Sequence, residues 1–271
     1  MRDLIIISNV SDDPFAIDIA HMCGQIEDMA DLISLKVYAN TEFCPRYLSD
    51  ENDMANIGKS LTGKTVVICS AATNHTRGSL ASRTFVLARA AKDNGAKQVI
   101  LVEPDLFFSA QDRGPHRGKD EESRPVEDLK KFDGQAFTAK LYAELLRLSG
   151  VDSVITVHNH SAKVQKLFSD TFSSGFYNLT PSEVYADYIK YSDMVSTGID
   201  GSNLVLCAPD MGAWPFVTQV RETLGLSGVS RVVMQKSRSG ERQVSMTLSA
   251  QSDIGLEGIA GKDVIVLDDM V

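Results

Sequence analysis

Acidic side chains follow two apolar segments of this chain, at the places where buried strands would end. Asp210 follows residues 204–209, and Asp268 and Asp269 follow residues 263–267. Carboxylates at the carboxyl ends of parallel strands lie where open α/β sheets bind their ligands. Their oxygens suit Mg²⁺ or the hydroxyl groups of a sugar. Capping of a following helix is the alternative for any one of them.

Two histidines and one basic segment add further chemistry. His158 and His160 follow the apolar run at residues 153–157, and alternation along an extended chain would place both on one side, where they could hold a divalent metal or contact phosphate. A structural role for these histidines is the alternative. Residues 236–242, KSRSGER, form a basic segment in an acidic protein. Lys236 and Arg238 could close over a phosphate chain and stabilise developing charge, with a solvated hairpin tip as the alternative.

A third pattern is misleading. Residues 58–65, GKSLTGKT, satisfy the phosphate-loop pattern GxxxxGK[ST]. That loop needs a strand before it and a helix after it, so that amides at the start of the helix face the phosphates. Here a polar stretch precedes the pattern and an apolar run follows it. We therefore predict that residues 58–65 are not a phosphate loop.

Short runs rich in Val, Ile and Leu alternate with stretches of helical spacing along the chain. The expected strands are residues 4–7, 65–69, 98–102, 153–157, 203–207, 231–234 and 263–267, and helical spacing is clearest at residues 80–92 and 136–148. Continuous apolar runs indicate strands covered on both faces, and alternation with helices indicates parallel pairing. The sequence therefore predicts an α/β fold with mainly parallel sheets flanked by helices.

Length and a faint internal similarity indicate two domains. A chain of 271 residues exceeds the usual size of one domain, and residues 62–68, TGKTVVI, resemble residues 260–266, AGKDVIV. The pattern pauses near residues 173–175, before a helix-start signal. We expect domains at residues 1–175 and 176–271. Residues 111–134 are dense in charge, Gly and Pro, which indicates either a functional loop or a solvated insertion.

The composition restricts the partners and the compartment. A net charge of −9, without a basic and aromatic stripe, repels polyanions, so nucleic acid is not expected as a partner. The four cysteines lack CxxC spacing, which is typical of a reduced, cytoplasmic protein. The first residues are too short and acidic for a signal peptide, and no apolar stretch has the length of a membrane span. We expect a cytoplasmic protein that does not enter the membrane.

Taken in chain order, several segments resemble the ribose-phosphate pyrophosphokinase (PRPP synthetase) family over essentially the whole chain. Residues 47–52, YLSDEN, resemble the family's Phe-Ser-Asp-Gly-Glu adenine loop, and residues 111–113 resemble its Arg-Gln-Asp-Arg segment. Residues 138–141 and 149–152 resemble the helix and turn that precede the family's metal histidine, and residues 157–160 resemble its Val-Asp-Leu-His segment. Residues 209–212 resemble its Pro-Asp-x-Gly segment. Residues 236–238 resemble its catalytic flexible loop, and residues 266–270 resemble the opening of its ribose-phosphate loop.

This resemblance implies two phosphoribosyltransferase-like domains, each a mainly parallel sheet flanked by helices, in a homo-oligomer of dimeric or hexameric size. It implies transfer of the diphosphate of Mg-ATP to the anomeric hydroxyl of ribose 5-phosphate, with release of AMP. The implied roles are Mg²⁺ binding for His160 and Asp210, stabilisation of the transferring diphosphate for Lys236 and Arg238, binding of ribose hydroxyls for Asp268 and Asp269, and contact along the nucleotide path for Asp50, Gln111 and Asp112.

Several positions depart from the family pattern. Ala110 replaces an arginine that could bind phosphate with two hydrogen bonds, and His158 replaces the metal-site aspartate. Leu48 replaces the adenine-stacking phenylalanine, and Asn52 replaces a glutamate. Residues 210–214 and 236–241 are similar to the divergent, phosphate-independent plant-type branch of the family.

The C-terminal part of the family pattern is shortened. The family continues with a Thr-Gly-Gly-Thr loop that cradles the 5-phosphate, so a chain that stops at Val271 is expected to lack synthetase activity, and we expect the complete protein to continue. A regulatory homologue that binds nucleotide or an active synthetase, without catalysing the reaction, is the second hypothesis. A salvage phosphoribosyltransferase is the third, although it normally needs only one such domain.

Overall fold

The computed structural model describes residues 3–71, 74–118, 121–159, 161–192, 195, 198, 200–238 and 244–268, with no side-chain placement for residues 236–238 and 244–245. The chain divides into a first unit, Met1–Leu179, and a second unit, Thr180–Val271. The first unit extends past residue 175 because strand β7 (Phe176–Leu179) pairs with strand β6 (Ser153–Val157).

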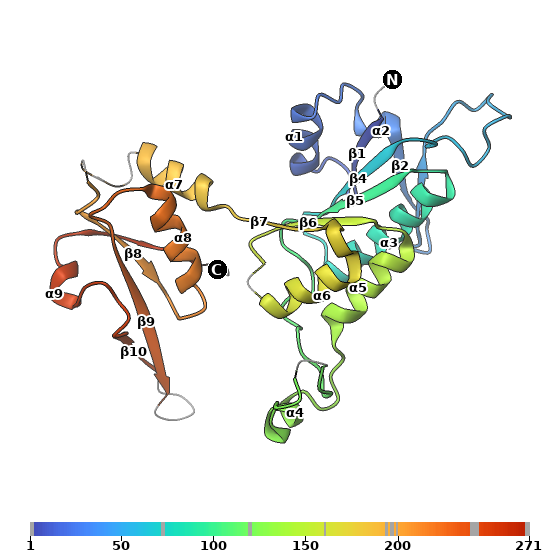
Figure 1. The fold of residues 1–271 in the computed structure, drawn as a ribbon. Coiled ribbons are helices and arrows are strands. Elements are labelled where there is room, and N and C mark those ends of the chain that lie inside the picture. The colour runs from blue at the N-terminus through green and yellow to red at the C-terminus, as the bar shows by residue number, and fades with distance from the viewer. Residues whose placement is uncertain are drawn as a thin grey trace. The chain divides into compact units, whose positions relative to one another are not determined.

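The first unit is built on a sheet of five parallel strands in the order β1-β4-β5-β6-β7 (Figure 1). The three strands that complete it are β1 (Leu4–Ser8), β4 (Thr65–Cys69) and β5 (Gln98–Val102). Strands β4, β5 and β6 begin and end where the apolar runs predicted. Their sequences are continuously apolar because central parallel strands are covered on both faces.

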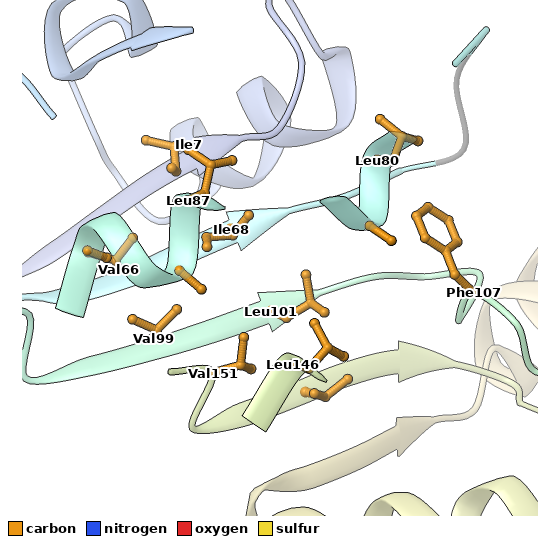
Figure 2. Close-up of a cluster of buried hydrophobic side chains, with 14 of the residues drawn as sticks. Ile7, Val66, Ile68, Leu80, Leu87, Val99, Leu101, Phe107, Leu146 and Val151 are labelled. Carbon is orange, nitrogen blue, oxygen red and sulfur yellow. The ribbon is translucent and has the colours of Figure 1, made fainter. Parts of the chain in front are cut away.

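Helices cover the two faces of this sheet unequally. One face packs against α3 (Arg77–Asp93), α5 (Thr138–Ser149) and α6 (Ala162–Phe172), with fully buried side chains such as Ile68, Leu87, Leu101 and Leu146 between the layers (Figure 2). On the other face α1 (Pro14–Met22) contributes Ala16 and Ala20 to a smaller cluster with Ile6, Val67 and Cys69.

The smaller elements of the first unit were not predicted. Strands β2 (Ile33–Val37) and β3 (Phe43–Tyr47) form an antiparallel hairpin, preceded by the short helix α2 (Met29–Leu32). Helix α4 (Val126–Lys131) lies within the charge-dense segment at residues 111–134, away from the sheet (Figure 1), and the 3-10 turn η1 (Ser173–Gly175) leads into β7. These elements are short and half-exposed, so their sequences carry little apolar periodicity.

The second unit contains a four-stranded sheet in the order β10-β9-β8-β11. Its strands are β8 (Leu204–Ala208), β9 (Ser230–Arg238), β10 (Val244–Leu248) and β11 (Asp263–Val266). Strand β8 pairs in parallel with β9 and β11, and β10 is antiparallel to β9. The predicted α/β class with mainly parallel sheets is confirmed.

Two helices pack on one face of this second sheet. Buried residues of α7 (Ser182–Tyr191) and α8 (Trp214–Leu224) meet Leu204 and Leu206 of β8. The opposite face of the sheet gathers Val205, Cys207 and Val232 with side chains near the short helix α9 (Leu256–Ile259). No helix in the part of the chain that the structure describes is long and apolar enough to cross a membrane.

Residues 58–65, which match the phosphate-loop pattern, lead into a strand as the sequence predicted. Its last residue, Thr65, is the first residue of β4, and the Thr65 N–H donates to the Asp3 carbonyl at 2.6 Å. Residues 58–65 therefore lead into a strand, and no helix start is available there to receive phosphate.

Candidate functional site

In the second unit, two of the predicted strand-end acids lie at the same edge of the sheet. Strands β8 and β11 are parallel neighbours, with Cys207 opposite Val266. The N–H of the buried Leu267 donates to the Cys207 carbonyl at 3.0 Å, which extends this register by one residue. Asp268 follows Leu267 directly, and Asp210 follows the end of β8 after Pro209, so both residues belong to the carboxyl edge at which such sheets bind ligands.

Asp210 closes the turn between β8 and α8. Its Oδ1 accepts the N–H groups of Gly212 at 2.7 Å and Ala213 at 3.2 Å, and the residue is exposed. Glycine at position 212 leaves room for this turn, because a Cβ there would lie 3.0 Å from the same Oδ1. Asp210 thus closes the turn before α8 and does not cap the helix, whose N-cap is Ala213, and its carboxylate still reaches solvent.

The basic segment differs from the expected mobile loop. Lys236 and Arg238 belong to β9, where they lie opposite Met246 and Val244 of β10. Their placement in a loop after Met234 is wrong, because the antiparallel partner extends the strand through residues that have little strand preference of their own. Asp269 and residues 239–243 lie outside the described residues.

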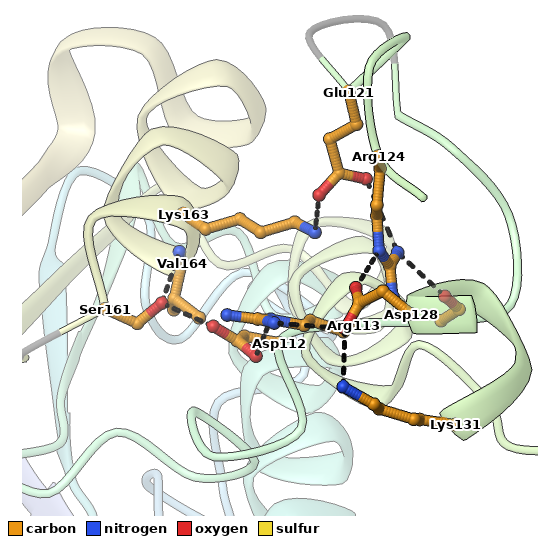
Figure 3. A network of polar contacts seen from close by, with 10 residues as sticks. Asp112, Arg113, Glu121, Arg124, Asp128, Lys131, Ser161, Lys163 and Val164 are labelled. Carbon is orange, nitrogen blue, oxygen red and sulfur yellow. Dashed lines mark hydrogen bonds and ion pairs between the residues drawn. The ribbon is translucent and has the colours of Figure 1, made fainter. Parts of the chain in front are cut away.

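In the first unit, Asp112 is held at the start of α6. The Ser161 hydroxyl donates to Asp112 Oδ2 at 2.9 Å (Figure 3). Ser161 is also the N-cap of α6, and its Oγ accepts the Val164 N–H at 3.3 Å. His160, the predicted metal ligand, precedes this serine and lies outside the described residues. Asp112 is thus brought to Ser161, at the start of α6.

His158 does not continue the strand before it. Its φ angle is +49°, a left-handed conformation that is uncommon outside glycine, and its N–H donates to the Leu179 carbonyl at 2.8 Å. The alternation that was expected to place His158 and His160 on one side assumes an extended backbone, and His158 does not have one.

Asn159 organises this turn, and the sequence analysis missed it. Asn159 is 7% exposed; its N–H donates to Asn178 Oδ1 at 2.8 Å, and its Oδ1 accepts the Ser161 N–H at 3.2 Å. The Gln165 amide donates to its carbonyl at 2.6 Å. The spacing Asn-x-Ser before a helix was the available signal, because an Asn side chain closes such a turn and Ser caps the helix that follows.

The charge-dense segment is tied to α6 through a network of ion pairs (Figure 3). Lys163 of α6 pairs with Glu121, and Arg124 pairs with Glu121 and Asp128. The bond from Lys163 is the main cause that holds the pKa of Glu121 below its ordinary value. Arg124 is 9% exposed and its guanidinium lies 5.1 Å from the centre of the Phe132 ring.

A hollow of about 640 Å³ opens beside this network. Its lining includes Asp112, Arg113, Arg124, Ser161 and Lys163. The cations that line it already face carboxylates, so the described surface of the hollow carries both signs of charge. The part of residues 111–134 that the structure describes therefore contains helix α4 and is joined to α6 by the ion pair between Lys163 and Glu121.

Asp50 and Gln111 have different surroundings. Asp50 Oδ1 accepts the Asn52 N–H at 2.9 Å and lines a separate hollow of about 290 Å³ with Tyr47 and Asn94. That hollow has no described residue in common with the hollow at Asp112. The Gln111 carbonyl accepts the Ala139 N–H at 3.2 Å, beside the start of α5. The first unit thus brings Gln111 and Asp112 together but does not bring Asp50 to them.

The residues present suit magnesium bound in part by phosphate. Among the residues that the structure describes, no group of three or more His, Cys, Asp or Glu side chains could hold a metal ion. Mg²⁺ is commonly held by one or two carboxylates together with substrate phosphates and water. The exposed carboxylate of Asp210 fits this mode of binding.

Curated relatives of the chain carry one name. Ribose-phosphate pyrophosphokinase from Methanobrevibacter smithii is 28% identical over 182 residues, which cover 66% of this chain and 52% of the relative. The enzyme of the same name from Helicobacter hepaticus is 28% identical over 227 residues, covering 82% of this chain and 60% of the relative. Ribose-phosphate pyrophosphokinase 1 from Streptococcus pneumoniae is also 28% identical, over 83% of this chain and 60% of the relative.

The chain therefore spans between one half and two thirds of the length of these relatives. No protein-family model matches it. Among solved structures, phosphoribosylpyrophosphate synthetase from Mycobacterium smegmatis has a similar fold, with a TM-score of 0.62 and 17% identity over 91% of this chain and 67% of that one. Sequence and fold thus point to the same relatives, the ribose-phosphate pyrophosphokinases.

Proposed function

We propose that this protein transfers the diphosphate of Mg-ATP to the anomeric hydroxyl of ribose 5-phosphate, giving PRPP and AMP. The observation that carries the proposal is the placement of Asp210 and Asp268 at the ends of paired parallel strands, in a chain related to ribose-phosphate pyrophosphokinases. Carboxylates at this edge suit both a metal-bound phosphate chain and the hydroxyls of a sugar. We place the protein in the cytoplasm as a homo-oligomer of dimeric or hexameric size.

The reaction is a displacement at phosphorus. The anomeric oxygen of ribose 5-phosphate forms a bond to the β-phosphorus of ATP while the bond from that phosphorus to the oxygen shared with the α-phosphate breaks, and AMP leaves. The hydroxyl proton passes to water. Such reactions depend mainly on positioning and on neutralisation of charge. No protein nucleophile is required.

Each predicted site residue has a role in this scheme. Asp268 and Asp269 accept hydrogen bonds from ribose hydroxyls and orient the anomeric oxygen. Lys236 and Arg238 balance the charge of the transferring diphosphate. Gln111, Asp112 and Asp50 contact the nucleotide.

The metal would be held by Asp210 and His160. Mg²⁺ bound there would supply charge neutralisation and alignment of the phosphate oxygens. The part of Asp210 is to keep one carboxylate at the strand end, fixed by its bonds to the amides of Gly212 and Ala213.

The second candidate is a regulatory homologue without catalysis. Ala110, which is exposed beside Gln111, supports this candidate because it offers no guanidinium to a phosphate chain. Such a protein would bind nucleotide or an active synthetase through the same units and release no AMP.

The first test is AMP release from ATP in the presence of ribose 5-phosphate and Mg²⁺. It is run on this chain and on a form extended at its C-terminus with the corresponding segment of a relative. We expect the extended form to release AMP, and Asp210→Asn in that form should reduce the rate about a hundredfold. The matched control is Asp200→Asn, because Asp200 is another exposed aspartate whose Oδ1 accepts an N–H two residues on, that of Ser202 at 3.0 Å.

The outcomes separate the two candidates. Equal losses in the two variants would remove Asp210 from the site. If nucleotide binds but neither form of the chain releases AMP, the result would favour the regulatory homologue. Absence of both binding and release would overturn the proposed function altogether.

A further inference from the structure

A buried carboxyl group outside the predicted site directly follows β5. Glu103 is fully buried, and its Oε2 accepts the Phe107 N–H at 2.9 Å. The hydroxyl of Tyr142, on α5, donates to its two oxygens at 2.9 and 3.1 Å. A buried carboxyl is costly unless hydrogen bonds satisfy it. Glu103 meets this condition by joining the loop after β5 to helix α5.

The same tyrosine is the centre of an aromatic cluster. The ring of Phe107 stacks 6.4 Å from the Tyr142 ring, and the ring of Phe108 meets it edge-on at 5.2 Å. Phe107 is fully buried and Phe108 is half-buried. Both aromatic residues of the loop are therefore packed against the side chain that Glu103 fixes.

Phe108 has a backbone conformation that needs such support. Its φ angle is +61°, in the left-handed region, which costs a bulky residue roughly 1–2 kcal/mol. The Phe108 carbonyl accepts the Gln111 N–H at 2.9 Å, and this bond closes a turn that leads to Gln111 and Asp112. A strained residue persists only where its surroundings fix it, and such residues are concentrated at functional sites.

We propose that Glu103 and Tyr142 are positioning residues that hold the loop at residues 107–112 so that Gln111 and Asp112 face the nucleotide. This inference rests on the proposed function. Neither residue touches the substrate. Glu103 acts through the Phe107 N–H, and Tyr142 acts through its hydroxyl, which holds Glu103, and through its contacts with the two phenylalanine rings.

The charge of Glu103 adds a dependence on pH. Burial raises the pKa of Glu103 to about 8, and the polar groups around it are the Tyr142 hydroxyl, the Ser70 side chain at the end of β4, the Phe107 N–H, and Asp105, which pairs with Arg77 of α3. Near neutral pH the carboxyl is uncharged. Above about pH 8 it ionises, and a charge in this dry site favours an open loop that admits water. Nucleotide affinity should then fall.

The test measures the dissociation constant of Mg-ATP by calorimetry across this pH range. We expect Tyr142→Phe to raise the constant about tenfold, because a loop in its binding conformation a tenth of the time binds tenfold more weakly. The matched control is Thr84→Val, which also removes one buried hydroxyl. Thr84 is fully buried on α3 of the first unit, and its hydroxyl donates to the Leu80 carbonyl at 3.0 Å. This control should leave the constant unchanged.

A second variant tests the charge. Glu103→Gln keeps a side-chain oxygen for the Phe107 N–H but cannot ionise. We expect it to bind Mg-ATP like the wild type near neutral pH and to lack the loss of affinity above about pH 8. Equal effects of Tyr142→Phe and Thr84→Val, or the same pH profile in Glu103→Gln and the wild type, would overturn the inference.

A readout without ligand separates this inference from the proposed function. If the wild type binds no Mg-ATP, the proposed function fails. Hydrogen exchange at the amides of Phe107 and Gln111 then decides whether the loop is held as described. Exchange should be faster in Tyr142→Phe than in Thr84→Val, and equal rates would overturn the positioning role whatever the ligand.

Discussion

Ser161 connects Asp112 to the first turn of α6, because its hydroxyl donates to the carboxylate while accepting the Val164 N–H. One side chain thus caps a helix and fixes a predicted nucleotide-binding residue. The two roles are separable by measurement.

Substitution of Ser161 by alanine should affect both stability and binding. We expect a loss of about 1 kcal/mol in the free energy of unfolding from the missing cap. Mg-ATP should also bind more weakly, because Asp112 loses its donor. Thr76→Ala is the control, since Thr76 Oγ1 caps α3 by accepting the Ser79 N–H at 3.3 Å, the same distance as in the α6 cap. Urea unfolding and calorimetry should show similar losses of stability but weaker binding only in Ser161→Ala.

Glu103 should make the free energy of unfolding fall as the pH rises. Its pKa is about 8 in the fold against an ordinary value of 4.5, so between these values the folded protein keeps a proton that the unfolded chain releases. The fall should approach about 1.4 kcal/mol per pH unit within this window and stop above it. Urea unfolding at a series of pH values measures it. The corresponding slope should be absent in Glu103→Gln, and a slope that survives this substitution belongs to other groups.

The ion pair between Lys163 and Glu121 should make the free energy of unfolding fall as the pH is lowered, opposite to the effect of Glu103. The pKa of Glu121 is lowered, chiefly by Lys163, so its stabilising contribution is complete above the ordinary value and is lost as the pH falls through the lowered one. Lys163→Ala should remove roughly 1 kcal/mol at neutral pH and part of the acid sensitivity.

Limited proteolysis offers a second view of the same ion pair. Because Lys163 ties residues 111–134 to α6, cleavage within that segment should be faster in Lys163→Ala. Lys166→Ala is the control, since Lys166 lies on the same helix and pairs with Asp170, a more exposed partner on α6 itself. Equal cleavage rates in the two variants would mean that the pair does not hold the segment.

Gly212 should matter for the candidate metal site more than for folding. A Cβ at this position would press on Asp210 Oδ1 at 3.0 Å, so Gly212→Ala should shift the carboxylate and weaken Mg²⁺-dependent nucleotide binding. Gly255→Ala is the control, because a Cβ there would meet no atom within 4 Å. Titrations of nucleotide with and without Mg²⁺ measure the effect. A shift in Gly212→Ala that does not depend on the metal would argue against this role for Asp210.

The sequence predicted the central strands well and the edge elements poorly. Residues 65–69, 98–102 and 153–157 are strands with the expected ends, because a strand covered on both faces has to be continuously apolar. The hairpin of β2 and β3 escaped notice because it contains Lys36, Pro45 and Arg46 and is half-exposed. Residues 236–238 resemble a loop, and only their pairing with β10 extends the strand.

The candidate site was predictable in its acids but not in its supports. Asp210 and Asp268 follow apolar runs, so their position at the strand ends could be inferred from order alone. The left-handed backbone of His158 is not encoded in the residue type. Asn159 and Glu103 act through partners distant in sequence, Asn178 and Tyr142, and such pairs become visible only in the fold.

The last strand of the first unit has a mechanical consequence. Asn178 and Leu179 of β7 accept the N–H groups of Asn159 and His158, both at 2.8 Å, and the chain leaves the unit immediately afterwards. The segment through which the chain leaves the first unit is therefore hydrogen-bonded to the turn before α6. A pulling force on the chain at Thr180 would act on these two hydrogen bonds as well as on the pairing of β7 with β6, and so would reach the turn that leads to Ser161 and Asp112.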